Sequence, residues 1–483
     1  MKPKVLHRFY EPLVLLKALN TEMNDIADSV DSETVEYRRN SKQAFQAFVY
    51  KPAHACDSVK GGKGGTITSV MVLESHSAMD NAVEFWFASN QLTSGELERT
   101  LRFITSVLDR LRTATLPQDG SAAARSNLLR LVLLFNQSRI ASYLTTIRME
   151  ARACFARCLI ARDEEDIDDC DVLLRRLIAL QASKVGECIS RRARQIRESG
   201  LQQRSMSCWP EMWHAMNRLL SYAQDVEFFL LAKQEWPELF EDFRVCFVPS
   251  SKLILRLRRP KSMVGKGIVG RMTSNEETMQ IFQDYIEDLQ LNALDERIRA
   301  EYQKTTFSPV VHSEILLLDA LEKSGHITPD RFFHEWMFIG SSKPLCRLCQ
   351  YYFKEHRSRV EHRGSHHNLY ISWRVPDVLL SQGAKGEERR QIMVDRMTPR
   401  IRQDAFDLVR KRVRPTFRDH DSFTSSARMT LDGRWTMTSN FSDVATRMES
   451  LALEDTEDNE GGATLGWTGI YKLVNVPLKI RPT

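Results

Sequence analysis

The sequence predicts an α/β protein, with a mostly α-helical N-terminal part followed by a domain in which helices pack on a sheet. Apolar residues recur at spacings of three and four from residue 82 to about residue 245, which indicates helices. Helical and strand-like segments then alternate between residues 307 and 373, as in a sheet covered by helices. At 483 residues the chain exceeds the roughly 250–300 residues at which one core stops growing, so we expect two or more domains.

The composition indicates a folded protein with a mild positive charge. Apolar residues make up 42% of the chain and charged residues 27%, which are values near globular averages. The formal net charge of +5 is too small for a chain whose whole surface binds nucleic acid. An anionic partner would therefore be bound by a local patch of the surface.

The cysteines and the apolar runs indicate the compartment. The N-terminal residues are a poor match to a signal peptide, and no apolar run reaches the length of a membrane span. The nine cysteines are an odd number and most are scattered, which favours reduced thiols over a disulfide framework. We therefore expect a cytoplasmic or nuclear protein without a membrane partner.

Changes in composition divide the chain into four expected segments. Residues 1–245 form a mostly helical N-terminal domain, to which no motif assigns a role. Residues 246–304 hold a basic hairpin or loop and a connecting helix, and the hairpin at 243–258 is the candidate for the first strands of the sheet. Residues 305–420 form the α/β domain, and residues 421–483 are an acidic, partly ordered tail.

Two helices and two strands are expected in the segment 307–373. The pattern predicts a helix from about residue 312, a strand at 336–340, a helix from about residue 344 and a strand at 368–373.

The spacing of four side chains in this segment predicts a metal site. His312 and Glu314 are two residues apart, so they share a site only if His312 lies in the first turn of its helix. Cys346 and Cys349 are three residues apart, which places both sulfur atoms on one face of a helix, and Pro344 suits the start of that helix. A helix N-terminus lowers the pKa of a thiol and so favours the thiolate that a metal needs.

This set of side chains is typical of a catalytic zinc site. One imidazole and two thiolates leave the fourth position of a tetrahedral Zn²⁺ open for water, which the metal acidifies. Attack on an amidine-like ring carbon then needs a group that moves protons, and the carboxylate of Glu314 is the candidate. His-x-Glu followed by Pro-Cys-x-x-Cys is the signature of zinc nucleobase deaminases, with a conserved Glu as the acid/base.

Three stretches of this segment resemble a known family. V-H-S-E-I-L-L-L, I-G-S-S-K-P-L-C-R-L-C and S-H-H-N-L-Y-I-S-W occur in the order found in the OTT-type nucleic acid or nucleotide deaminases of fungi, within the cytidine-deaminase-like superfamily. The resemblance covers roughly residues 305–375. It implies a three-layer α/β/α fold, a zinc ion held by His312, Cys346 and Cys349, and Glu314 as the proton shuttle.

The resemblance extends to two further residues and includes one departure. His366 and Trp373 match the family's pattern, so they are expected to line the substrate site or to support the ligands. Leu345 separates Pro344 from Cys346, whereas the superfamily usually has Pro directly before the first Cys. This departure affects the start of the helix and leaves the expected ligand set unchanged.

A zinc finger is the alternative use of the same cysteines. Cys346-x2-Cys349-x12-His362-x3-His366 has the spacing of a structural two-Cys, two-His site, which would make the chain a non-catalytic zinc-finger or interaction protein. Against this alternative, Arg359 stands where a finger has a large apolar residue, and the His-x-Glu pair is left unexplained. The deaminase interpretation accounts for more of the residues.

The expected substrate is a nucleobase in a nucleotide or a nucleic acid. Two segments rich in Lys and Arg, 251–272 and 389–418, could bind phosphate, with Tyr351, Tyr352 and Phe353 as nearby aromatic residues for stacking. The alternative is that the basic segments are solvated helix faces. Choice between cytosine and adenine, or between DNA and RNA, depends on pocket shape, which motifs do not encode.

Overall fold

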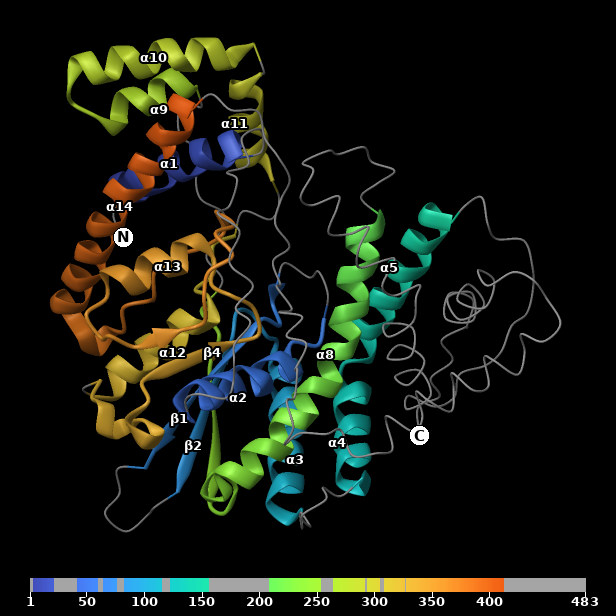
Figure 1. The fold of residues 1–483 in the computed structure, drawn as a ribbon. Coiled ribbons are helices and arrows are strands. Elements are labelled where there is room, and N and C mark those ends of the chain that lie inside the picture. Colours follow the sequence, from blue (N-terminus) through green and yellow to red (C-terminus); the bar gives the residue numbers. More distant parts are fainter. Residues whose placement is uncertain are drawn as a thin grey trace.

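The chain folds as a mixed α/β protein that is mostly helical and contains a five-stranded mixed sheet (Figure 1). The structure is a computed structural model. It describes residues 3–20, 41–59, 64–75, 82–114, 122–155, 208–252, 264–291, 293–304, 308–325 and 327–411.

The sheet joins strands from distant parts of the sequence. Its order is β3-β2-β1-β4-β5, where β1 is Thr68–Glu74, β2 Val83–Ser89, β3 Phe243–Val248, β4 Phe338–Ser341 and β5 Glu361–His362. β1 pairs antiparallel with both β2 and β4, while β2 pairs parallel with β3 and β4 parallel with β5. The boundary expected near residue 245 stays a prediction, but the sheet has strands on both sides of it.

The prediction of helix at residues 82–92 is wrong, because this segment forms β2. Phe85 and Phe87 are fully buried, and Ala88 on the other side of the strand is fully buried too. A strand covered on both faces has no clear alternation of apolar and polar residues, so its sequence resembles that of a buried helix. β1 and β2 supply the strands that precede the His-x-Glu helix.

The hairpin expected at residues 243–258 is described only in its first half. Phe243–Val248 forms the strand β3, which pairs in parallel with β2. Residues 253–263 lie outside the described residues.

Side chains of the central strand alternate between two clusters of buried apolar residues. Val70 and Val72 of β1 belong to one cluster, and Met71 and Leu73 belong to the other, as the two-residue period of a strand requires. Each cluster is completed by a different set of helices, so helical segments pack against both faces of the sheet.

The cluster of Val70 and Val72 includes residues of α2, α3, α4, α5, α8 and the short helix η2. These helices are Ser41–Cys56, Ser94–Thr113, Ala122–Phe135, Gln137–Phe155, Cys208–Glu235 and Pro237–Phe240.

The cluster of Met71 and Leu73 includes residues of α1, α9, α10, α11, α12, α13 and α14. These helices are Pro3–Asn20, Gly265–Met272, Glu276–Gln290, Leu294–Gln303, Ser313–Ser324, Arg347–Glu355 and Gly383–Lys411. Three short 3₁₀ helices, η3, η4 and η5, span Pro329–Arg331, Phe333–Glu335 and Leu380–Gln382. The connecting helix expected before residue 304 is divided into α10 and α11.

Three of the four elements expected in the segment 307–373 are confirmed as α12, β4 and α13. The strand expected at 368–373 is wrong, because only Trp373 of this stretch makes a β-bridge, with Val310. Its backbone bonds to two separate segments: the Asn368 carbonyl accepts from the Arg347 amide and the Ser372 carbonyl from the Val310 amide. Residues 368–373 therefore bond through their backbone to the segments at the starts of α12 and α13.

Two further expectations concern the tail and the membrane. The expected tail at 421–483 lies outside the described residues. Among the helices that the structure describes, none is long and apolar enough to cross a membrane.

Replacing Gly340 with Ala is expected to destabilise the protein, because α2 lies directly against β4 at this position. A Cβ atom at Gly340 would lie 2.7 Å from the backbone nitrogen of Tyr50 and 2.9 Å from its Cα. Backbone atoms cannot rotate away as a side chain can, and overpacking of this kind lowers the free energy of unfolding by about 1–3 kcal/mol. We expect a lower midpoint of denaturant unfolding, followed by circular dichroism.

Gly95→Ala is the matched control, because a Cβ atom there meets nothing within 4 Å. An unchanged midpoint in Gly340→Ala would contradict the close packing of α2 on β4.

Candidate metal centre

Three side chains that the sequence singles out meet at the starts of α12 and α13. The Nδ1 atom of His312 lies 3.5 Å from the sulfur of Cys346 and 3.3 Å from that of Cys349, and the two sulfur atoms are 3.4 Å apart. Tetrahedral zinc, with bonds of about 2.3 Å to sulfur and 2.0 Å to nitrogen, holds such donors roughly 3.5–3.8 Å apart. The donor set and its spacing therefore fit a zinc ion.

His312 is the N-cap residue of α12, and its side chain does not cap the helix. Its backbone is extended, with φ −74° and ψ 152°, which leaves the imidazole free to face the cysteines. Asn90, at the end of β2, caps the helix instead: its Oδ1 accepts a hydrogen bond of 2.8 Å from the amide of Ser313. His312 therefore directly precedes the first turn of α12, in which it was expected to lie.

Glu314 lies in the first turn of α12 and is only 4% exposed. The hydroxyl of Ser313 donates to its Oε2 at 3.2 Å, and Ser313 is itself bonded to the hydroxyl of Ser69 in β1 at 2.7 Å. The side chain of Glu314 also interacts with the thiol of Cys349. The carboxylate is thus held beside the cluster.

Cys346 is the N-cap residue of α13, and its sulfur accepts a hydrogen bond of 3.4 Å from the amide of Cys349. Leu345, which departs from the usual pattern, precedes the helix and forms a β-bridge with Ser365. Its amide donates to the carbonyl of Gly364 at 2.8 Å. The extra residue therefore joins the first cysteine to the segment after β5 and leaves both sulfur atoms on the same side of α13.

Burial and charge together set the protonation of the cluster. Burial alone would lower the pKa of His312, but the nearby Cys346 thiolate raises it above the usual value. Burial alone would raise the pKa of Cys346, but its hydrogen bond with Cys349 and the charge of His312 lower it to about 6. Burial and the bond with Cys346 raise the pKa of Cys349 well above the ordinary value. The metal-free cluster therefore holds one thiolate and one thiol near neutral pH.

Trp373 contacts the cluster directly. Its indole Nε1 donates to the sulfur of Cys349 at 3.1 Å, and the side chain is fully buried. The hydroxyl of Tyr10, in α1, donates to the carbonyl of Trp373 at 2.8 Å. An indole donor on the sulfur stabilises its thiolate form and orients it. Tyr10, Ser69 and Asn90 were not predicted, because no local motif links them to residues so far along the chain.

His366 is not part of the described cluster of metal-type donors. The Nδ1 atom accepts from the amide of Asn368 at 3.1 Å, and the ring packs edge-on against Tyr370 with centroids 5.8 Å apart. The Tyr370 ring in turn lies 6.3 Å from that of His312. His366 therefore supports an aromatic side chain beside the candidate ligand.

The geometry does not favour the zinc-finger alternative. Among the described residues, the cluster of metal-type donors around the two cysteines includes His312 and neither His362 nor His366. The Nδ1 of His362 bonds to the carbonyl of Arg363 at 2.9 Å, and its ring packs on Phe353.

Comparison with known proteins agrees with this geometry. Residues 311–377 match the family model described as OTT_1508-like deaminase. This segment is a deaminase-like domain. It contains the N-terminal ends of α12 and α13, where the cluster lies, together with His366 and Trp373. No curated protein and no solved structure matches the chain.

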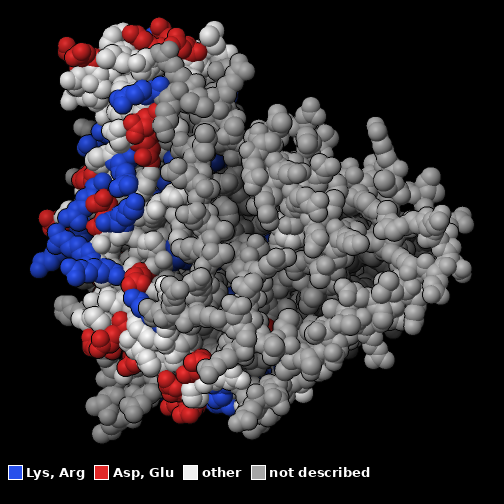
Figure 2. Space-filling model, viewed as in Figure 1, with Lys and Arg blue, Asp and Glu red and all other residues white. Residues whose placement is uncertain are grey.

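Lys and Arg side chains gather over α14 and the end of α13, as Figure 2 shows. The exposed cations of these elements include Lys354 and Arg357 at the end of α13, and Lys385, Arg389, Arg396, Arg400 and Arg410 in α14. This surface lies at the end of α13 away from the cysteines, because the cysteines stand at its start.

The aromatic residues expected to stack with bases near the basic segments are buried. Tyr351, Tyr352 and Phe353 are 6–8% exposed, because α13 packs them into the core. Contact of these basic segments with nucleic acid stays a prediction.

Titration of the thiols in zinc-free protein tests the electrostatics of the cluster. Because the pKa of Cys346 is about 6, its thiolate is present above that pH, and thiolate absorbance at 240 nm should rise between roughly pH 5 and pH 7, below the usual range of a thiol. Cys346→Ser should remove this rise, whereas Cys56→Ser should keep it, since burial raises the pKa of Cys56. A wild-type protein without thiolate absorbance below pH 8 would contradict the geometry.

Proposed function

We propose that this protein is a zinc-dependent hydrolytic deaminase that acts on a nucleobase in a nucleotide or a nucleic acid. The observation that carries the proposal is the meeting of one imidazole nitrogen and two sulfur atoms beside a buried carboxylate, inside the segment that matches a deaminase family. The helices that pack on both faces of the sheet support the three-layer α/β/α arrangement that the resemblance implies.

His312, Cys346 and Cys349 would hold the metal. Two thiolates and one imidazole are soft and borderline donors, a set that suits zinc and leaves one position open. Zinc bound there would supply a water that is acidic enough to act as a nucleophile near neutral pH. Reduced thiols are needed for this site, which supports a cytoplasmic or nuclear location.

Glu314 would move the protons. In a hydrolytic deamination a C–O bond forms to water at the ring carbon, the C–N bond to the amine breaks, and ammonia leaves. The carboxylate of Glu314 would take one proton from the attacking water and deliver it to the ring nitrogen, and would then take the remaining hydroxyl proton and deliver it to the departing amine, so that a carbonyl and ammonia form. The hydroxyl of Ser313 on Oε2 holds the carboxylate in place for both transfers.

Trp373 and His366 would support the site in different ways. Trp373 is fully buried and bonded to Cys349, so we assign it to orienting that ligand. His366 packs against Tyr370, which is only partly buried and lies beside His312. We therefore assign Tyr370 to the wall of the substrate site and His366 to holding it there.

Zinc content of purified protein tests the ligand set. We expect close to one zinc per chain in the wild type, by elemental analysis, and loss of that zinc in His312→Ala. The double variant His362→Ala, His366→Ala should keep its zinc, because neither imidazole lies in the cluster. Loss of zinc only in the double variant would make the site a structural finger and would contradict the proposal.

Glu314→Gln is expected to keep zinc and to lose turnover. General acid–base catalysis by one side chain contributes roughly 10²–10⁴-fold, so ammonia release should fall by at least that lower factor. The assay uses cytosine- and adenine-containing nucleosides, nucleotides and single-stranded oligonucleotides. Glu322→Gln is the control, since Glu322 is exposed at the far end of α12. Equal turnover in Glu314→Gln and the wild type would remove Glu314 from the mechanism.

A further inference from the structure

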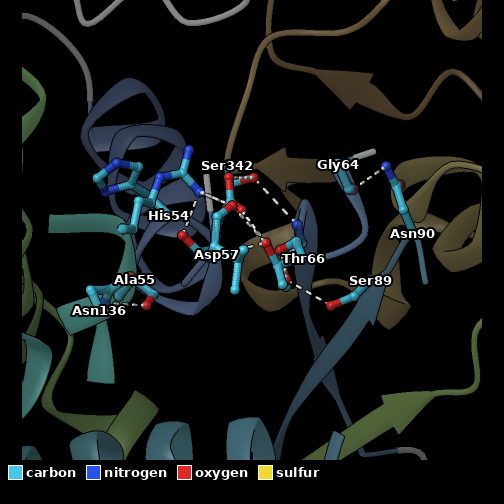
Figure 3. A network of polar contacts seen from close by, with 12 residues as sticks. His54, Ala55, Asp57, Gly64, Thr66, Ser89, Asn90, Asn136 and Ser342 are labelled. Atoms are coloured by element: carbon cyan, nitrogen blue, oxygen red, sulfur yellow. Dashed lines mark hydrogen bonds and ion pairs between the residues drawn. The ribbon is translucent and has the colours of Figure 1, made fainter. Parts of the chain in front are cut away.

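A buried carboxylate lies outside the described cluster of metal-type donors but is linked to the segment that leads into it. Asp57 follows the end of α2 and is 1% exposed. Figure 3 shows it between Thr66 and Ser342, whose hydroxyls donate to its two oxygens at 2.7 and 3.3 Å. Each oxygen of the carboxylate thus accepts from a different segment of the chain.

Arg139, in α5, compensates the buried charge of Asp57. Its guanidinium lies 2.5 Å from Oδ1 of Asp57 and also donates to the backbone carbonyl of the same residue. Burial would raise the pKa of Asp57, but Arg139, Lys343 and Thr66 hold it below the usual value. Asp57 is therefore an ionised acceptor, able to accept from both hydroxyls at once.

One branch of the network reaches the cysteines. Ser342 directly follows β4, and its amide donates to the carbonyl of Thr68 at 2.8 Å while its hydroxyl accepts from the Thr68 amide at 3.3 Å. Only Lys343, Pro344 and Leu345 separate it from Cys346. The segment that delivers the first cysteine is therefore anchored at Ser342.

A second branch reaches the histidine. The hydroxyl of Thr68 is bonded to that of Ser89 at 2.7 Å, and Asn90 follows directly. The Nδ2 atom of Asn90 donates to the carbonyl of Gly64 at 3.0 Å, while its Oδ1 accepts from Ser313. Thr68 of β1 thus contacts the segment that leads into α13, and Asn90 after β2 contacts the start of α12.

We propose that Asp57, held by Arg139, is a positioning residue of the metal centre: through Ser342 it fixes the segment that brings Cys346 and Cys349 to His312. This inference rests on the proposed metal site. It assigns a role in that site to α2 and α5, which lie outside the segment that matches the deaminase family. A carboxylate is needed because its two oxygens accept from two donors, whereas an amide offers one acceptor.

The test compares zinc affinity with the stability of the zinc-free protein. Ser342→Ala removes the hydroxyl that joins Asp57 to the cysteine segment and leaves the ion pair with Arg139 intact. Ser221→Ala is the matched control: Ser221 is also buried, in α8, and its hydroxyl bonds to the backbone carbonyl of Arg218 and to His54, not to the segment that leads to Cys346. The zinc dissociation constant is measured by competition with a chromophoric chelator, and the melting temperature of zinc-free protein is measured alongside it.

Ser342→Ala is expected to weaken zinc binding by roughly 10-fold, the lower end of the effect of removing a group that orients metal ligands. Its zinc-free melting temperature should fall no further than that of Ser221→Ala, which should bind zinc as the wild type does. Asp57→Asn should weaken binding by at least as much as Ser342→Ala.

Three results would overturn the inference. In the first, Ser342→Ala and Asp57→Asn bind zinc as tightly as the wild type, which would leave the proposed function intact. In the second, the affinity of Ser342→Ala and Ser221→Ala falls together with their melting temperatures, which would make the role one of general stability. In the third, the wild type binds no zinc, which would overturn the proposed function as well. If Asp57→Asn does not fold, Ser342→Ala still decides the question.

Discussion

Ser69 and Val70 of β1 pair with Ser341 and Gly340 of β4, and this short antiparallel contact joins the two halves of the chain. β1 also pairs with β2, and Asn90 at the end of β2 accepts a hydrogen bond from the start of α12. Gly340 carries no side chain, so α2 can lie directly on β4. The deaminase-like segment supplies the candidate ligands, but most of the sheet beneath them comes from earlier in the sequence.

The starts of two helices converge on the cluster, and this geometry explains its electrostatics. Each helix start presents unpaired amides and the positive end of its dipole, which stabilise a thiolate. The sulfur of Cys346 accepts a hydrogen bond from one of these amides, and the imidazole of His312 adds further positive charge. Cys349 keeps its proton in the metal-free protein, so binding of a metal would release that proton. In the cluster, the thiolate sulfur atoms are the donors whose charge would favour a metal cation.

Local patterns in the sequence were sufficient to predict the cluster of His312, Cys346 and Cys349, but not the long-range pairings of the strands. His312, Cys346 and Cys349 follow from the spacing within two helix starts, which depends on a few neighbouring residues. The sequence predicts a helix where β2 forms, because burial on both faces removes the alternation that marks a strand. The partners of β1, and the hydrogen bonds from Asn90 to α12, depend on the assembled sheet, so no window of sequence contains them.

We propose that one zinc ion binds between the starts of α12 and α13. A crystal structure of the zinc-loaded protein, with anomalous data collected at the zinc edge, tests it most directly. We expect one anomalous peak about 2.0–2.3 Å from the Nδ1 of His312 and from the sulfur atoms of Cys346 and Cys349. A peak bound by His362 and His366, or no peak beside His312, would contradict the account.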